Sequence, residues 1–436
     1  MFEGRLNKTI LFLIYVSVFV NSYVFAQQPV EIYFGYVVFV LLLPFFMLRH
    51  KVPGYFLVIF MILLLAGITN IILGHNTFPQ FLKVFLGVLF SYLFYYYVVV
   101  QFDFNVERLF QFYLLGCYIV AVIGVIQFVS YQVHFEPGYD YSWLLNKWGV
   151  LVGGNFGIRV NSIFGEPTHF GACVSAGAFV SIFNLISKKP YYLSRLQSAV
   201  ILIAYLLTFS GLAYFGLFIA ILILLINFGF VRYVLVFAPL LIAAFSYLYA
   251  NVPEFRERFT STIDIFETGK FRIGKTHGSS IILYNNYRIA FENFSTNFLV
   301  GTGLGSHPIA FEKYSITKKV EQRGFDLNSQ DANSMLLRLI SETGLFGTIL
   351  MLGVVFKHFI RRNPYLDVPD HFWIISGAIF TMVAVNFLRQ GHYFLNGFPF
   401  FIWLYYFNHV NYRKYQAEHL APEVPAIEVP PTQNAQ

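Results

Sequence analysis

The sequence predicts an all-α, multi-pass membrane protein with about twelve transmembrane helices and two large loops on the non-cytoplasmic side. Of the 436 residues, 57% are hydrophobic and only 12% are charged, whereas a soluble domain carries about 25% charged residues. The 53 Phe and 30 Tyr are more than one soluble core of this length could bury, but lipid can cover such a surface. Most of the net charge of +7 lies in short loops, where it orients a membrane protein, so nucleic-acid binding is not expected.

Ten apolar runs are long enough to cross a bilayer, which requires about 20 residues because hydrocarbon satisfies no backbone polar group. They lie at 9–26, 31–48, 55–73, 82–101, 109–131, 167–187, 233–250, 333–356, 371–388 and 393–411. The uncharged stretch between Arg195 and Arg232 would measure about 54 Å as one helix, too long for a single crossing. Ser210-Gly211 interrupts it, so two short helices are expected at 196–209 and 212–230, as two crossings or as a re-entrant hairpin.

Basic residues predict the orientation of these spans, because cytoplasmic loops carry an excess of Lys and Arg. With Arg5 and Lys8 in the cytoplasm, strict alternation leaves the short outward loops at 27–30, 74–81 and 210–211 without any Lys or Arg. Both termini are then cytoplasmic. The same alternation assigns these residues to the cytoplasmic side: Arg49, Lys51, Arg108, Lys188, Lys189, Arg195, Arg232, Lys357, Arg361, Arg362, Arg413 and Lys414.

A single transmembrane domain is expected over 1–416, followed by a polar, proline-containing tail at 417–436 that should be disordered and cytoplasmic. The outward loops cover about 132–166 and 251–332. The second loop contains an amphipathic segment, Ile281 to Phe298, that predicts a helix, and the Gly301-Thr-Gly-Leu-Gly305 run after it predicts a turn. Val24-Phe25-Ala26 resembles the end of a cleavable signal peptide, but an uncleaved first span is favoured because another apolar segment follows closely.

Ionisable residues at the outward edges of the spans are the candidate functional residues, because a charge at the membrane boundary is costly unless it is paired or solvated. Arg side chains match phosphate oxygens in bidentate geometry and stay charged at any pH, so several arginines on one face favour a diphosphate ligand. Neither paired carboxylates nor a Cys/His cluster occurs in these loops, so no metal ion or other cofactor is expected. The candidates are Arg159, Glu166, His169, Arg288, Asp331, Arg338, Arg389 and His392.

Purely structural roles are open for several candidates. Arg288 with Glu292, and Arg338 with Glu342, are spaced i, i+4 and could form helix-surface ion pairs. Glu166-Pro167 is typical of a helix start, where a carboxylate interacts favourably with the helix dipole.

Three segments, in order along the chain, resemble bacterial O-antigen polymerases and ligases. The first, from Arg159 to Gly171, looks like their Arg…Phe-x-Glu-Pro-x-x-x-Gly segment. The second, Asn286-Tyr-Arg288 followed by Gly301–Gly305, is similar to the Arg-then-Gly-x-Gly segment of their large periplasmic loop. The third, from Asp331 to Gly347, looks like their His-Asn…Glu-x-Gly-x-x-Gly segment.

The resemblance implies a GT-C-like, metal-independent glycosyltransferase of the bacterial inner membrane that joins undecaprenyl-pyrophosphate-linked oligosaccharide repeat units at the periplasmic face. The bilayer and a chain-length regulator protein are the implied partners, with no role for nucleic acid. Arg288, Arg159 and Arg389 would neutralise the pyrophosphate, and Glu166 or Asp331 would accept or orient the acceptor hydroxyl. The implied substrate-binding residues are Arg159, His169, Tyr287, Asn333, Arg338, Arg389 and His392.

Two departures from the family pattern bear on the choice of reaction. Ala332 stands where ligases carry His, which removes their presumed base and disfavours transfer to the lipid A core. Thr208-Phe-Ser210-Gly211 stands where relatives often have Ser-Arg. A ligase and a lipid-linked oligosaccharide flippase are the alternatives, although transporters place ionisable groups at mid-membrane and the spans here are nearly free of charge there.

Overall fold

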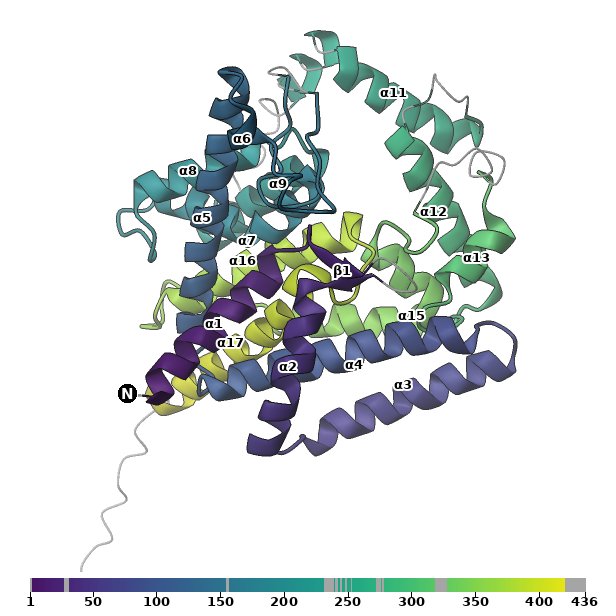
Figure 1. Ribbon diagram of the computed structural model, residues 1–436, viewed down its shortest axis with the longest axis horizontal. Coiled ribbons are helices and arrows are strands. Elements are labelled where there is room, and N and C mark those ends of the chain that lie inside the picture. Colours follow the sequence, from purple (N-terminus) through teal and green to yellow (C-terminus); the bar gives the residue numbers. More distant parts are fainter. Residues whose placement is uncertain are drawn as a thin grey trace, which may run out of the picture.

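The computed structural model describes residues 2–26, 31–153, 157–230, 239, 242–243, 245–247, 249–251, 253–271, 276, 278–317 and 328–419. Helices dominate these ranges, and α3 and α4 run side by side (Figure 1). The apolar helices are α1 (Phe2–Phe19), α2 (Phe34–Arg49), α3 (Gly54–Ile72), α4 (Phe78–Gln101), α5 (Val106–Gln132), α7 (Pro167–Ile186), α8 (Arg195–Leu206), α9 (Gly211–Asn227), α15 (Met335–Lys357), α16 (His371–Arg389) and α17 (Phe398–His419). The predicted all-α membrane class is confirmed.

Among the described residues, six helices are long and apolar enough to cross a membrane, namely α3, α4, α5, α7, α15 and α16. Four shorter apolar helices correspond to α1, α2, α8 and α9. The break predicted at Ser210-Gly211 is present, because α8 ends at Leu206 and α9 begins at Gly211. The span predicted at 233–250 lies outside the continuously described residues, so the number of crossings stays a prediction.

The first predicted span is wrong at its outward end. The helix α1 stops at Phe19, and Val24–Ala26 (β1) pairs antiparallel with Ile32–Tyr33 (β2). The Asn146 side chain accepts a hydrogen bond from the Val24 N–H at 2.9 Å and donates one to the Val24 carbonyl at 2.6 Å. A side chain from the 132–166 loop therefore satisfies backbone groups that a longer helix would have paired internally.

Loops and span ends that strict alternation places on the same side meet in the fold. At one end, Asn21 bonds Asn396 at 2.5 Å and Asn76 bonds the Leu304 carbonyl at 2.8 Å. At the other end of the same helices, Gln101 bonds Asn7 at 3.0 Å. We call these the outward end and the inward end, after the predicted orientation.

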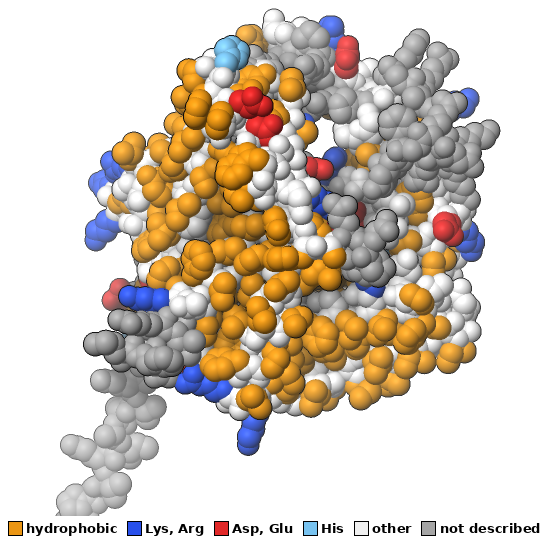
Figure 2. All heavy atoms as spheres, viewed as in Figure 1, with side chains coloured by type: hydrophobic (Ala, Val, Ile, Leu, Met, Phe, Trp, Pro, Cys, Tyr) orange, Lys and Arg blue, Asp and Glu red, His pale blue; other side chains and the backbone are white. Residues whose placement is uncertain are grey.

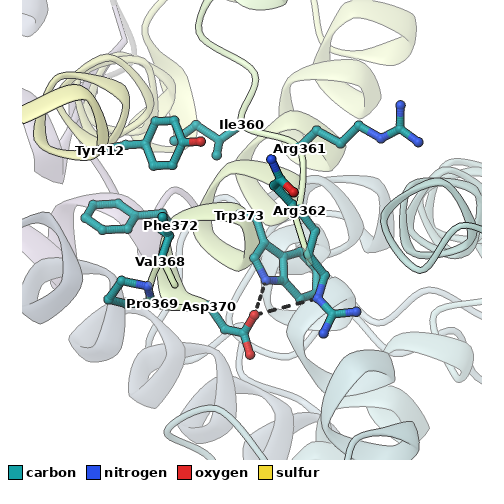
Figure 3. Close-up of a pocket in the computed structure, with 10 residues that line it drawn as sticks. Ile360, Arg361, Arg362, Val368, Pro369, Asp370, Phe372, Trp373 and Tyr412 are labelled. Atoms are coloured by element: carbon teal, nitrogen blue, oxygen red, sulfur yellow. Dashed lines mark hydrogen bonds and ion pairs between the residues drawn. The ribbon is translucent and has the colours of Figure 1, made fainter. Parts of the chain in front are cut away.

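A small pocket at the inward end is lined by the connection between α15 and α16 (Figure 3). Asp370 accepts a hydrogen bond from Trp373 Nε1 at 2.6 Å and lies 3.7 Å from Arg362 Nε. The Arg362 guanidinium lies 5.0 Å from the Phe228 ring centre, in cation–π geometry. The volume of about 20 Å³ holds no more than a water molecule, so this pocket is too small for a substrate.

The helix α7 occupies the centre of the bundle and packs against α8, α9 and α16. Small residues permit these close contacts. A Cβ on Gly171 would lie 3.1 Å from the Ala213 side chain, and one on Gly177 would lie 2.8 Å from Cys117 Sγ. This packing fixes the start of α7, and with it Glu166, at the outward end.

The helix α3, in contrast, is covered by little protein. Its exposed side chains include Leu57, Val58, Ile62 and Leu65, each more than half accessible. Figure 2 shows apolar side chains spread over much of one face of the molecule. A surface this apolar is expected where lipid replaces water.

The 251–332 loop is largely helical where it is described. It contains α11 (Pro253–Thr268), α12 (Gly278–Thr296) and α13 (His307–Tyr314). The helix predicted at 281–298 is therefore confirmed as α12, which packs against α15. The 132–166 loop contains one short helix, α6 (Glu136–Tyr139). Residues 417–419, predicted to be disordered, complete α17, and residues 420–436 lie outside the described ranges.

Candidate functional site

A cleft of about 750 Å³ opens at the outward end between α7, α9, α12, α16 and the loop before α7. Two of the predicted arginines, Arg159 and Arg389, line it together with Glu166. The other residues that line it are Leu151, Gly165, Pro167, Thr168, Ser210, Gly211, Leu212, Phe215, Ser279, Leu283 and Leu388. Segments more than 200 residues apart in the sequence thus form one charged opening.

Arg159 is held in this cleft by the break between α8 and α9. Its Nε donates a hydrogen bond of 3.4 Å to the Thr208 carbonyl, and its backbone N–H bonds the Leu151 carbonyl at 2.9 Å. The half-buried side chain is thereby positioned by the Thr208–Gly211 segment, which lacks the arginine expected from the family pattern.

Glu166 and Arg389 lie at the outward ends of α7 and α16. Glu166 is the N-cap residue of α7, as its position before Pro167 predicted, and it accepts a hydrogen bond from the Thr168 hydroxyl at 2.7 Å. It also interacts electrostatically with Arg389, the last residue of α16. The exposed carboxylate therefore partly balances a cation at the cleft.

Ser210 brings a buried polar atom to the same cleft. It is the N-cap residue of α9, yet its side chain makes no capping hydrogen bond. Its hydroxyl is fully buried and has no hydrogen-bond partner among the residues that the structure describes. Because α7 and α9 both begin at the cleft, the positive ends of two helix dipoles face it.

The Asp331 carboxylate and the His392 imidazole are in direct contact at the outward end. Asp331 Oδ2 lies 2.7 Å from His392 Nε2, and Asp331 Oδ1 accepts the Asn333 backbone N–H at 2.9 Å. Burial raises the pKa of the Asp331 carboxyl, but the His392 imidazole, and then Arg338, outweigh burial and hold this pKa below its ordinary value. His169 interacts electrostatically with both members of the pair and with Glu166, which connects the pair to the start of α7.

The N-terminal hairpin adds a charged cluster that the sequence analysis missed. Lys147 Nζ lies 2.7 and 2.6 Å from the two carboxylate oxygens of Glu31 and 2.7 Å from the Tyr33 hydroxyl. Burial raises the pKa of Glu31, but its bonds to Lys147 and Tyr33 and the nearby His392 lower it overall. The available signal was that Glu31 is a charged residue at the outward end of the predicted span 31–48 and that Lys147 lies in the predicted outward loop 132–166.

Arg338 is turned into the protein rather than toward the cleft. The side chains of Arg338 and Glu342 are 4% and 0% exposed, and Arg338 Nε lies 2.9 Å from Glu342 Oε1. Arg338 also donates to the Gly391 carbonyl at 2.7 Å. Glu342 accepts hydrogen bonds from the Gly305 N–H at 2.9 Å, the Tyr393 hydroxyl at 3.0 Å and the His307 N–H at 3.3 Å. This pair therefore joins α15 to the 301–307 and 391–393 segments.

The Gly301–Gly305 run forms the predicted turn and docks on α15. Gly301, Gly303 and Gly305 have φ values of +65°, +91° and +81°, which only glycine adopts readily. A Cβ on Gly305 would lie 2.5 Å from the Gln80 carbonyl oxygen, and one on Gly301 would lie 2.5 Å from the Glu342 backbone. These glycines therefore serve close packing.

Arg288 and Tyr287 lie on α12 outside the cleft lining. The Arg288 side chain is 44% exposed, and its Nε is 4.0 Å from Glu292 Oε1. Tyr287 stacks on Phe291 with a ring separation of 6.1 Å. The cleft is reached by Ser279 and Leu283 of this helix instead. The predicted contact of Arg288 with a diphosphate stays a prediction.

The helices and this cleft define a multi-pass membrane protein with two arginines in one cleft at the outward end. Residues 196–352, from α8 into α15, match the O-antigen ligase family. This match confirms the resemblance of the motifs to the O-antigen polymerase and ligase superfamily, a group of glycosyltransferase- and ligase-type enzymes. No curated protein matches the chain.

The matched region contains Ser210, Arg288, Asp331 and Arg338. Arg159, Glu166, Arg389 and His392 lie outside it, so their grouping around the cleft comes from the three-dimensional arrangement.

Proposed function

We propose that this protein is a polymerase that joins undecaprenyl-pyrophosphate-linked oligosaccharide repeat units at the periplasmic face of the bacterial inner membrane. The observation that supports this proposal is the cleft of about 750 Å³ that contains Arg159 and Arg389 at the outward end. The protein would act while embedded in the lipid bilayer, and a chain-length regulator protein is its proposed partner.

The cleft walls suit an amphipathic ligand. Leu212, Phe215 and Leu388 line the same opening as the two arginines. Apolar side chains at a membrane boundary accommodate isoprenoid units, while guanidinium groups bind phosphate oxygens in bidentate geometry. A lipid diphosphate carries an apolar isoprenoid chain directly next to its phosphate oxygens.

In this glycosyl transfer the main requirement is stabilisation of the departing lipid diphosphate. The acceptor hydroxyl attacks the anomeric carbon of the growing chain, and the lipid diphosphate departs with the bonding electron pair. Arg159 and Arg389 neutralise the charge that develops on its oxygens, and the starts of α7 and α9 add favourable dipoles. Because the diphosphate is already a good leaving group, no metal ion is required in this mechanism.

The ligase alternative is less well supported. Ala332, which stands where ligases carry their presumed base, is 1% exposed. The flippase alternative calls for ionisable groups along a path through the bilayer, whereas Arg338 and Glu342 in α15 are buried and bonded to each other.

The pattern of surface polysaccharide in a deletion strain separates these possibilities. A polymerase deletion should leave lipid A core capped with single repeat units and remove the longer chains. If all capping disappeared while lipid-linked polymer accumulated, the protein would be a ligase. If repeat units accumulated on the cytoplasmic side, it would be a flippase.

Replacing Ser210 with alanine should slow polymerisation about tenfold or more, the effect of one hydrogen bond to a charged oxygen of about 1.5–3 kcal/mol. The reason is that its buried hydroxyl, which lacks a partner among the described residues, would donate to a diphosphate oxygen. Initial rates of reconstituted protein check this. Ser181→Ala is the matched control, because its hydroxyl is also buried without a partner among the described residues but lies in the interior of α7. Equal rates for Ser210→Ala and the parent would remove Ser210 from the site.

A further inference from the structure

We infer that His392 accepts the proton from the acceptor hydroxyl and that Asp331 is its positioning residue. This inference rests on the proposed glycosyl transfer. It assigns the proton acceptor, for which the diphosphate-binding role of Arg159 and Arg389 gives no candidate. Its basis is the pair formed by two residues from different segments, Asp331 before α15 and His392 after α16.

The pair is built into the fold by several contacts. A Cβ on Gly391 would lie 2.7 Å from Asp331 Cβ, so glycine is required beside His392 for the two segments to approach. Asp331 Oδ1 is bonded to the Asn333 N–H, which leaves Oδ2 for His392. The Gly391 carbonyl is in turn held by Arg338 at 2.7 Å. The Gly391 backbone and the Asp331 side chain thus both restrict the position of the His392 imidazole.

The contact between Asp331 and His392 selects the tautomer that a base needs. A carboxylate 2.7 Å from Nε2 accepts the proton on that nitrogen. In the neutral imidazole, Nδ1 then carries the lone pair. Nδ1 takes no part in the contact with Asp331, and the His392 side chain is 36% exposed. This nitrogen is therefore open to a substrate hydroxyl.

The pair is connected to the diphosphate cleft through Arg389 and through the start of α7. His392 follows Arg389 by three residues, and Arg389 lines the cleft. His169, one turn beyond Glu166 on α7, interacts electrostatically with both Asp331 and His392. Proton acceptor and leaving-group cations therefore occupy neighbouring parts of one outward surface.

The charged groups around His392 come from four segments. Asp331 contacts it directly, Glu31 from the N-terminal hairpin and His169 from α7 interact with it electrostatically, and Lys147 is bonded to Glu31. Asp331 stays ionised at neutral and mildly acidic pH, because its pKa is held below the ordinary value. A fall in the reaction rate at low pH, the acidic limb of the pH profile, would therefore not come from protonation of Asp331.

The step balances without another reactant. As the hydroxyl oxygen forms its bond to the anomeric carbon, its proton moves to His392 Nδ1. The bond from the anomeric carbon to the diphosphate oxygen breaks, and its electrons leave with the lipid diphosphate. The imidazolium, stabilised by Asp331, then returns the proton to solvent.

Initial rates of reconstituted protein between pH 5 and 9 test the assignment. The parent rate should fall as the pH is lowered, because a protonated imidazole cannot accept a proton. His392→Gln should reduce the rate on the order of 100-fold and flatten that limb. Asp331→Asn should also reduce the rate and displace the limb, since the tautomer is no longer fixed, whereas Asp331→Glu should restore part of the loss.

Chemical rescue separates catalysis from structure. Added imidazole should raise the rate of His392→Ala in proportion to the fraction of imidazole that is neutral, because it can occupy the partly exposed space. The matched control is His75→Gln, another outward histidine, which bonds Asn70 at 3.2 Å; it should keep the parent pH profile.

Two results would overturn the inference. One is a His392→Gln protein with the parent rate and pH profile. The other is a Glu166→Gln protein that alone loses the acidic limb, which would make Glu166 the base. In both cases the parent protein would still make polymer, so the proposed function would stand. Absence of polymer with the parent protein would instead reject the proposed function.

Discussion

Alanine at Arg159 or at Arg389 should lower the rate of polymer formation by about 100-fold or more, the effect of removing one preorganised group that stabilises developing charge. Both guanidinium groups line the cleft in which we place the leaving diphosphate. Lysine at either position should recover part of the loss, because it keeps the charge without the bidentate geometry. The rates would be measured on purified protein in lipid discs with a synthetic lipid-linked repeat unit.

Two further arginines serve as comparisons for this result. Arg361→Ala, at the inward end and exposed, should keep the parent rate. Arg288→Ala should have a smaller effect than Arg159→Ala, because Arg288 is exposed and paired with Glu292 outside the cleft lining. If Arg288→Ala abolished polymerisation while Arg159→Ala did not, the diphosphate would lie elsewhere on α12.

Breaking the pair between Arg338 and Glu342 should have the largest effect on stability. Glu342→Gln or Arg338→Met leaves one buried charge without its partner, which costs roughly 3–5 kcal/mol. Glu342→Gln also weakens the acceptor of the Gly305, His307 and Tyr393 hydrogen bonds. We expect a markedly lower melting temperature in detergent and less protein recovered from membranes.

The chain contains a matched control for this experiment. Arg288 and Glu292 have the same residue types and the same spacing on α12, but their side chains are 44% and 47% exposed. Glu292→Gln should therefore change stability by about 0.5 kcal/mol or less. A Glu342→Gln protein with the parent melting temperature and no activity would assign Glu342 to the chemistry instead.

These two pairs also mark what the sequence can predict. The i, i+4 spacing predicted a possible ion pair in both places, and both pairs are present. Spacing says nothing about burial, however, because burial depends on which segments pack over a helix. Only the structure places the 301–307 and 391–393 segments over Arg338, so its predicted substrate contact is not supported by this geometry.

Elements with strong local signals were predicted well. The start of α7 at Pro167, the amphipathic helix α12, the break at Ser210-Gly211 and the turn at Gly301–Gly305 all follow from local propensity or periodicity. The β1–β2 hairpin was missed because apolar composition alone predicted a continuing helix. Its strand is stabilised by Asn146, more than 100 residues away.

The candidate site required the same kind of long-range information. Arg159, Glu166 and Arg389 were predicted to be outward, but their meeting in one cleft depends on how α7, α9 and α16 pack. The contact between Asp331 and His392 depends on Gly391 and has no signature in sequence spacing. Ser210 was visible only as a departure from the family pattern.

The most direct test of the central claim is reconstitution of the purified protein in lipid discs with a single lipid-diphosphate-linked oligosaccharide, followed by sizing of the products. We predict a ladder of glycans that increase by one repeat unit, with lipid diphosphate released in equal amount and with no ladder from the Arg159→Ala protein. Glycan transferred only to added lipid A core, or a ladder that persists without Arg159 and Arg389, would contradict the account.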